Sequence, residues 1–264
     1  FWAINLGYAV SMTAAGWLAQ AGFLWLFWIN AVTSVGFAVL VWRAVPETTP
    51  SKDQSERGSL IDALRDRVML AFTAVVFGNA LVYAQTYTML PVAMTTKVGL
   101  DTHEFGMTVA INGVLIVAVQ PLVTGWLGRR DLSRTLALGL VVMAVGFAAT
   151  TFVTNVAWLV VTVVIWTSGE ILTAGIVGTI IASLAPPHLR GRYSGLFGFA
   201  WSVATMVAPL LGGALLDVGS AALWLTIGAV GLAAAAGMLA LGPAIRRRSQ
   251  TSVEAAPAQV AEAV

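Results

Sequence analysis

The sequence predicts an all-α integral membrane protein with about eight transmembrane helices. Three observations support this prediction. Only 10% of the 264 residues are charged, whereas soluble domains are about 25% charged. The mean hydropathy is +0.86 over the whole chain, which leaves too few polar side chains to form a water-facing surface. Apolar segments of about 20 residues, the length needed to cross a bilayer, follow one another along the chain.

Eight segments satisfy this length requirement. They are apolar on all sides, which favours helices over the period-two alternation of β-barrel strands. Phe1 already lies within such a pattern and no basic leader precedes it, so we expect a fragment that begins inside a transmembrane helix. The predicted spans are 1–19, 23–42, 68–92, 105–127, 133–152, 157–183, 193–216 and 220–242.

The distribution of basic residues predicts the orientation of the chain. Lys and Arg accumulate in the cytoplasmic loops of membrane proteins. One side of the predicted topology carries thirteen of the fourteen Lys and Arg residues, and the other side carries only Lys97. We therefore expect a multi-pass protein of the cell (inner) membrane. The segments 43–67, 129–134 and 186–192 and the C-terminus are predicted to be cytoplasmic.

The longest connection divides the chain into parts. Within it, Ser59 and Asp62 have the spacing of a capping box. They predict a short amphipathic helix over 60–67 that runs into the next span. The tail is poor in large apolar residues and is predicted to be disordered. The predicted parts are two helices in 1–42, a central cytoplasmic loop in 43–67, a six-helix bundle in 68–244 and a cytoplasmic tail in 245–264.

Composition excludes several classes of function. The chain has no cysteine and only two histidines, which rules out disulfides, thiolate metal ligands and His-rich metal sites. It has no phosphate-binding loop and no metalloprotease or serine-hydrolase motif, so we expect no enzymatic activity. The arginines lie in short runs between apolar blocks rather than on one face, so we expect no nucleic-acid partner.

Glu170 is the only charged side chain deep inside a predicted span. It lies about 20 Å from the start of its helix, at a rise of 1.5 Å per residue. An ionised carboxylate near the bilayer centre costs at least about 2.5 kcal/mol, so such a residue faces the bundle interior or a water-filled cavity. We consider two roles: a carboxyl group that exchanges a proton during function, or a protonated one that donates a structural hydrogen bond.

Polar side chains in three spans are predicted to line a central cavity. Those in 68–92 follow i, i+4, i+8 spacing, and those in 157–183 share the helix face of Glu170. Alternatively, these side chains form hydrogen bonds between helices, which contribute about 0.6 kcal/mol per bond. For Gln120, which precedes Pro121, the alternative is packing at a kink in the helix. The side chain of Gln85 points away from Tyr83 and is expected to form a hydrogen bond to another helix. The predicted cavity-lining residues are Asn79, Tyr83, Tyr87, Asn112, Gln120, Thr167 and Thr173.

Two helices, a long cytoplasmic loop and six further helices resemble part of the plan of the major facilitator superfamily. That family has six helices, a central loop and six more helices, so this chain looks like the fold from its fifth helix onward. Residues 4–16 resemble the fifth-helix motif of drug/proton antiporters, with Ser11-Met12 in place of its Gly-Pro pair. Residues 184–195 resemble the loop between the tenth and eleventh helices.

A second loop resembles the Gly/Arg motif of the same family. It runs from Gly125 to Arg130, and Arg129 stands where the motif has an acidic residue. The basic residues of both loops have two interpretations. They set the topology, or they form a cytoplasmic latch that pairs with acidic residues or helix C-termini in one state. The residues of these loop motifs are Gly125, Arg129, Arg130, Arg134, Arg190, Gly191 and Arg192.

The resemblance implies alternating access, in which two bundles rock around a central site near the bilayer midplane. The predicted cavity is apolar, with Tyr, Asn and Gln side chains and a single acid, which suits lipophilic substrates better than sugars. Together with the resemblance, it predicts proton-coupled efflux of small amphipathic compounds, including drugs, by an antiporter in which Glu170 couples to protons. The partners would be the substrate, protons and the lipid bilayer. The proton gradient would replace any cofactor, and we expect a monomer. The alternatives are a proton-coupled carrier of a polar metabolite and a non-transporting membrane scaffold or sensor.

Overall fold

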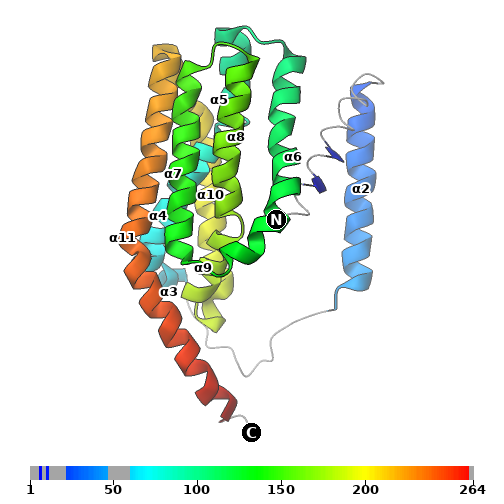
Figure 1. Ribbon diagram of the computed structural model, residues 1–264. Helices are drawn as coiled ribbons and strands as arrows, with labels where there is room; N and C mark the ends of the chain where they lie inside the picture. The colour runs from blue at the N-terminus through cyan, green and yellow to red at the C-terminus, as the bar shows by residue number, and fades with distance from the viewer. Residues whose placement is uncertain (1–5, 8–9, 12–21, 47–59, 262–264) are drawn as a thin grey trace. The chain divides into compact units, whose positions relative to one another are not determined.

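The computed structural model describes residues 6–7, 10–11, 22–46 and 60–261, which lie in helices and short connections. The chain separates into two compact units, Phe1–Glu56 and Arg57–Val264. In the described residues, seven helical segments are long and apolar enough to cross a membrane. One belongs to the first unit, and the other six form the second unit, which we call the bundle (Figure 1). The predicted all-α membrane fold is confirmed.

In the first unit, helix α2 spans Phe23–Ala44. Its large apolar side chains are mostly exposed, as expected for a helix that contacts lipid or other helices rather than water. The helix ends before Pro46, because a residue that precedes proline is disfavoured in the helical conformation. The predicted span 1–19 and the Ser11-Met12 motif lie almost wholly outside the described residues.

The bundle begins with a short helix, α3 (Leu60–Arg65), and the longer α4 (Arg67–Ala84). Asp66 separates them, and its side chain accepts hydrogen bonds from two backbone N–H groups of the first turn of α4, at 3.1 and 3.2 Å. The short helix predicted over 60–67 is present, but it ends at Arg65, because Asp66 as an N-cap residue leaves the helical conformation and starts a new helix. Ser59 lies outside the described residues.

Two predicted spans are interrupted. After α4, the turn 85–88 leads to α5 (Met89–Ala93) and the π-helical turn η2 (Met94–Val98). The span that contains Glu170 consists of α8 (Val156–Thr173) and α9 (Ile176–Leu184). Gly175, between the latter two helices, has a φ of 75°, a left-handed conformation that glycine adopts without steric cost.

The remaining elements are α6 (Thr102–Leu127), α7 (Leu132–Ala149), η3 (Thr150–Phe152), η4 (Pro187–Leu189), α10 (Arg190–Val218) and α11 (Ser220–Ala261). Helices α6, α10 and α11 extend beyond their predicted limits, α11 most of all, whereas α7 ends three residues early. The predicted disordered tail differs from the structure, in which the helix continues to Ala261. Ala, Glu and Gln are strong helix formers, so this polar segment prolongs the preceding span.

Helix α7 packs against α8 and α11, while α4 packs against α10 and α11, and α6 packs against α8. Glycines bring α7 and α8 close together. A Cβ atom on Gly169 would lie 2.6 Å from the carbonyl oxygen of Gly139 and the backbone nitrogen of Met143. Small residues at such crossings let helices approach closely in lipid. This crossing positions the residue that follows Gly169, which is Glu170.

One end of the bundle carries most of its basic residues (lower end in Figure 1). Helices α4, α7 and α10 begin there, and α6 and α9 end there. We call it the basic end. One apolar cluster fills the half of the bundle near this end, with side chains from α4, α7, α9 and α11. A second cluster fills the opposite half, with side chains from α5, α7, α8 and α11.

Candidate functional site

Glu170 lies inside the bundle on α8, with only 4% of its surface exposed. Asn112, on α6, is 8% exposed and faces it. The Nδ2 atom of Asn112 donates to Oε2 of Glu170 at 2.8 Å and to Oγ1 of Thr167 at 3.0 Å. Thr167 is fully buried one turn before Glu170 on α8. One amide therefore joins α6 to two polar side chains of α8.

Tyr83 adds a third helix to this site. Its side chain, on α4, also hydrogen-bonds to the Glu170 carboxyl group. We call Tyr83, Asn112, Thr167 and Glu170 the Glu170 cluster. In the part of the chain that the structure describes, no Lys, Arg or His forms an ion pair with Glu170. The polar contacts of this carboxyl group therefore come from neutral donors. Without them, a buried charge would be costly.

A row of aromatic rings extends from the cluster. Tyr83 contacts Tyr87 edge-on with ring centroids 6.2 Å apart, and contacts Trp201 at 5.7 Å. Trp201 contacts Phe197 at 6.1 Å. We call these four residues the aromatic row. Phe197 and Trp201, the two members on α10, were not predicted from the sequence, although they have the same i, i+4 spacing as Tyr83 on α4 and Tyr87 in the turn that follows it.

The other predicted cavity residues lie outside the cluster. The hydroxyl of Thr173 donates to the backbone oxygen of Glu170 at 2.9 Å, so it is directed to its own helix. Gln120 is buried, and its Oε1 atom has no hydrogen-bond partner. Asn79 is partly buried one turn before Tyr83. The roles of all these residues remain predictions.

Gln85 follows its predicted behaviour. It is fully buried, and its Nε2 atom donates to the backbone oxygen of Ala208 at 3.3 Å. This bond links α4 to α10. Gln85 thus connects two helices of the bundle rather than joining the Glu170 cluster.

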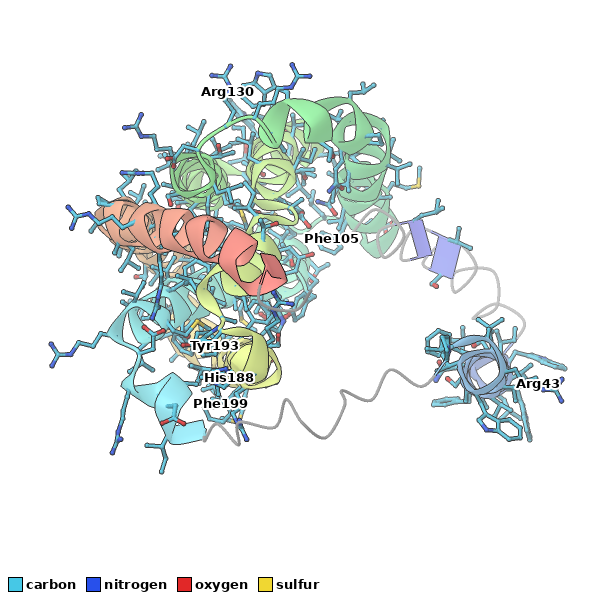
Figure 2. The ribbon with its side chains drawn as sticks, turned by 90° about the horizontal axis from the view of Figure 1, so that it is seen from below. Arg43, Phe105, Arg130, His188, Tyr193 and Phe199 are labelled. Atoms are coloured by element: carbon cyan, nitrogen blue, oxygen red, sulfur yellow. The ribbon has the colours of Figure 1, made fainter. Side chains whose placement is uncertain are left out.

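Acidic residues at the basic end are paired with arginines from α11. Asp66 accepts from the hydroxyl of Tyr193 and from Nη1 of Arg248, each at 2.6 Å. Asp131 caps α7 through the Arg134 N–H at 2.8 Å and forms a salt bridge with Arg246 at 3.0 Å. Figure 2 shows the bundle from this end.

These contacts change the acidity of both aspartates. Burial alone would raise the pKa of Asp66, but hydrogen bonds from Tyr193, the Met69 N–H and Arg248 outweigh it and lower the pKa from 3.8. For Asp131, burial alone would likewise raise the pKa, but the bonds from the Arg134 N–H and from Arg246 together outweigh it, and the pKa is lowered. Both side chains are therefore carboxylates at neutral pH.

The loop arginines lie at the same end. Arg130 lies over the Trp126 ring, 4.6 Å from its centroid, in a cation–π contact. Arg129 and Arg134 are exposed, and Arg190 and Arg192 lie in the first turn of α10. Gly125 and Gly191 have open space where a Cβ atom would lie. The latch interpretation of these residues remains a prediction.

Comparison with known proteins connects this bundle to a family. A model of the Major Facilitator Superfamily matches residues 1–209 and 75–263. The uncharacterised MFS-type transporter YttB of Bacillus subtilis strain 168 is 28% identical over 220 residues, covering 81% of this chain and 55% of that protein. The Multidrug resistance protein MdtH of Yersinia pestis strain Pestoides F is 23% identical over 242 residues, covering 89% of this chain and 60% of that protein.

This chain thus spans between half and two thirds of the length of these relatives. The two overlapping matches to the family model together cover nearly all residues of this chain. The helices that cross the membrane agree with that match. The chain belongs to the major facilitator superfamily, a family of transporters.

Proposed function

We propose that this chain is part of a proton-coupled efflux transporter for small amphipathic compounds. In this proposal Glu170 takes up and releases the coupling proton. The observation that carries the proposal is the burial of its carboxyl group at the meeting point of α4, α6 and α8, with neutral hydrogen-bond donors and no ion pair to any described residue. Intramembrane acids in such positions commonly form proton relays in transporters.

The geometry around Glu170 supports exchange of a proton. Asn112 donates to the carboxylate form, and its amide oxygen offers an acceptor to a protonated form after a side-chain flip. Tyr83 can donate or accept. The donors therefore tolerate both protonation states, whereas an arginine would hold the acid ionised.

The break after α8 supports a moving part near this acid. The backbone oxygen of Glu170 accepts from the Ala174 N–H at 3.0 Å, which is the last bond before the break. Discontinuous helices are typical of binding sites in transporters of this architecture. A change at the Glu170 carboxyl group lies one helical turn from the joint that connects α9.

The aromatic row supports amphipathic substrates. Tyrosine and tryptophan rings present apolar faces with a polar edge, which suits lipophilic molecules better than sugars. One relative carries the name Multidrug resistance protein MdtH. The alternatives, a proton-coupled carrier of a polar metabolite and a non-transporting scaffold or sensor, predict different behaviour in the experiment below.

The test is the variant Glu170→Gln in the full-length protein, expressed in cells that lack other exporters. We expect loss of resistance to amphipathic drugs, and loss of drug-induced proton release in vesicles, because an amide cannot take up the proton. Membrane insertion is checked by immunoblotting. The matched control is Glu104→Gln, the same chemical change at an exposed position on α6, which is expected to behave as the wild type.

Other results would contradict the proposal. Unchanged resistance in Glu170→Gln removes this residue from coupling. Proton-driven flux of a polar metabolite, without any effect on drug resistance, identifies the metabolite carrier. Absence of flux in the wild type, with a partner protein that co-purifies, identifies a scaffold.

A further inference from the structure

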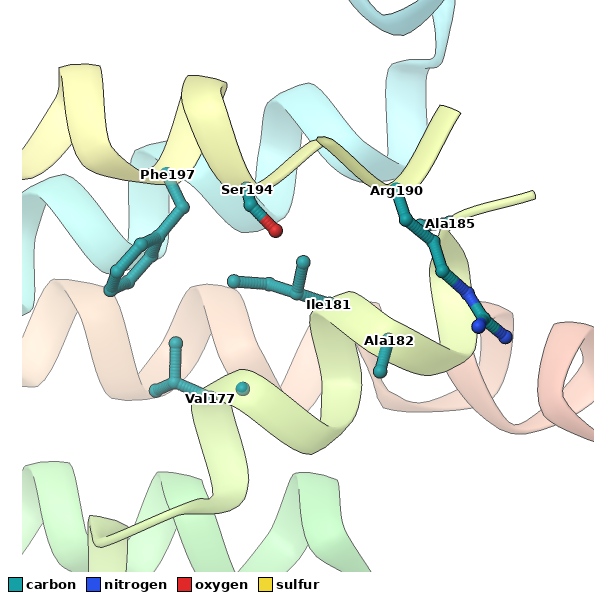
Figure 3. A pocket seen from close by; sticks show the side chains of 8 residues that line it. Val177, Ile181, Ala182, Ala185, Arg190, Ser194 and Phe197 are labelled. Atoms are coloured by element: carbon teal, nitrogen blue, oxygen red, sulfur yellow. The ribbon is translucent and has the colours of Figure 1, made fainter. Parts of the chain in front are cut away.

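A pocket of about 350 Å³ opens between α9 and the first turns of α10, on the surface of the bundle at its basic end (Figure 3). Most of its eight lining residues are apolar, and they include Val177, Ile181 and Phe197. Its polar lining consists of Arg190 and Ser194. The Glu170 cluster contributes no side chain to it, and the aromatic row contributes only its last member, Phe197.

The lining is graded from polar to apolar along the pocket. In Figure 3, Arg190 lies at the end near the α9–α10 connection, and Phe197 and Val177 lie at the other end. Ser194 lies between them, with its hydroxyl directed into the pocket. From Val177 to Ala185, α9 rises about 12 Å at 1.5 Å per residue. The pocket is thus elongated and amphipathic, with the guanidinium group nearest the helix ends.

The charge of the pocket is uncompensated. No Asp or Glu lines it, and Arg190 forms no ion pair with any residue that the structure describes. Arg246 and Arg248, at the same end of the bundle, are each paired with an aspartate. The complementary ligand is therefore an anion that carries an apolar group.

We propose that this pocket binds one anionic phospholipid, with its phosphate at Arg190 and the start of an acyl chain along Val177, Ile181 and Phe197. Basic pockets between transmembrane helices at a membrane interface are suited to such headgroups. The site lies beyond the proposed transport function and does not depend on it. A lipid in this position contacts both α9 and α10, and thereby holds α9, which joins α8 only through Ala174 and Gly175.

The apolar lining decides between a lipid and a soluble anion. An exposed arginine gains little from a small soluble anion, because water screens a surface ion pair. The apolar lining of the pocket contributes to binding only when a hydrocarbon group covers it and removes it from water. A lipophilic cation, in contrast, would meet Arg190 without any acid to balance its charge.

The experiment measures lipid binding to the full-length protein by native mass spectrometry after delipidation. Phosphatidylglycerol is titrated against phosphatidylcholine, which has no net charge. We expect one tightly held phosphatidylglycerol in the wild type, and about tenfold weaker binding in Arg190→Gln, since a hydrogen bond to a charged group is lost. The control Arg192→Gln, two residues further on and outside the pocket, is expected to bind as the wild type does.

A second variant tests the apolar part. Gly178 lines the pocket, and a Cβ atom there meets open space, so Gly178→Leu places an apolar side chain in the cavity, and leucine favours the helix over glycine. We expect it to lose the tight phosphatidylglycerol while Arg190 remains. Wild-type binding by both variants would overturn the proposal. So would competition by inorganic phosphate at similar concentration, which identifies a soluble anion, or a wild type that retains no lipid because other parts of the protein cover the pocket.

Discussion

The bundle holds its acidic residues in two different ways. Glu170, in the interior, contacts neutral donors from Asn112 and Tyr83. Asp66 and Asp131, at the basic end, contact arginines of α11 and backbone N–H groups of helix starts. The interior acid thus has no counter-ion among the residues that the structure describes, whereas the acids at the end of the bundle are paired and cap helices.

This difference separates an acid that can change its charge from acids that cannot. An arginine pair and helix N-termini both favour the ionised form, so Asp66 and Asp131 keep one state near neutral pH. Asn112 and Tyr83 impose no such preference by charge. The cluster suits proton exchange, and the basic end suits a permanent connection among α4, α7, α10 and α11.

The largest expected effect is on stability at the basic end. Asp66→Ala removes the cap of α4 and the acceptor for Tyr193 and Arg248, and the Asp66 side chain is only 8% exposed. We expect the free energy of unfolding to fall by about 2–3 kcal/mol, from a cap of about 1 kcal/mol and the loss of buried partners. Chemical denaturation of the purified full-length protein in detergent measures it.

Two related variants make this prediction specific. Asp66→Asn keeps an acceptor for the cap and is expected to cost less. Asp131→Ala, where the carboxylate is 27% exposed, is expected to cost about 1 kcal/mol, the value of a cap alone. Equal losses for Asp66→Ala and Asp131→Ala would contradict the view that burial distinguishes them.

A smaller effect is expected in the Glu170 cluster. Asn112→Val removes the amide that joins Glu170 to Thr167, and we expect a loss of about 1 kcal/mol in the free energy of unfolding, near the value of hydrogen bonds between helices in membranes. The control is Asn79→Val, the same change at a partly buried position outside the cluster. If both variants are equally stable, the bond from Asn112 contributes nothing to the bundle.

The smallest effect is on the dependence of stability on pH near neutrality. Folding lowers the pKa of Asp66 and Asp131 below 3.8, so their contribution is complete above that value and is lost as the pH falls through the folded pKa. We expect the contribution of these two aspartates to stability to be constant from about pH 7 to about pH 5 and to be lost below about pH 4.

The control for this measurement is Asp66→Asn, whose stability should fall less steeply in acid because one of the two titrating groups is gone. A difference between the wild type and Asp66→Asn that changes already near neutral pH would contradict the lowered pKa of Asp66. A decline identical in the wild type and in Asp66→Asn would show that Asp66 makes no contribution.

Particular residues show how far the sequence could predict the site. Glu170 could be identified from its position alone, because a carboxylate in a long apolar segment is rare and costly. The spacing of Asn79, Tyr83 and Tyr87 suggested a shared face, yet only Tyr83 contacts Glu170. Periodicity gives the face of a helix, and it does not give which neighbour the face meets or at what depth.

The membrane-crossing segments were determined by the sequence itself, because hydropathy over about 20 residues decides whether a helix can enter lipid. Only the tertiary structure decided the partners. Asp66 and Arg248 are 182 residues apart in the chain, Asn112 and Glu170 are 58 apart, and Trp201 meets Tyr83 across two helices. Such contacts depend on how the helices pack against one another, through close approaches such as that at Gly169, and local sequence does not encode that packing.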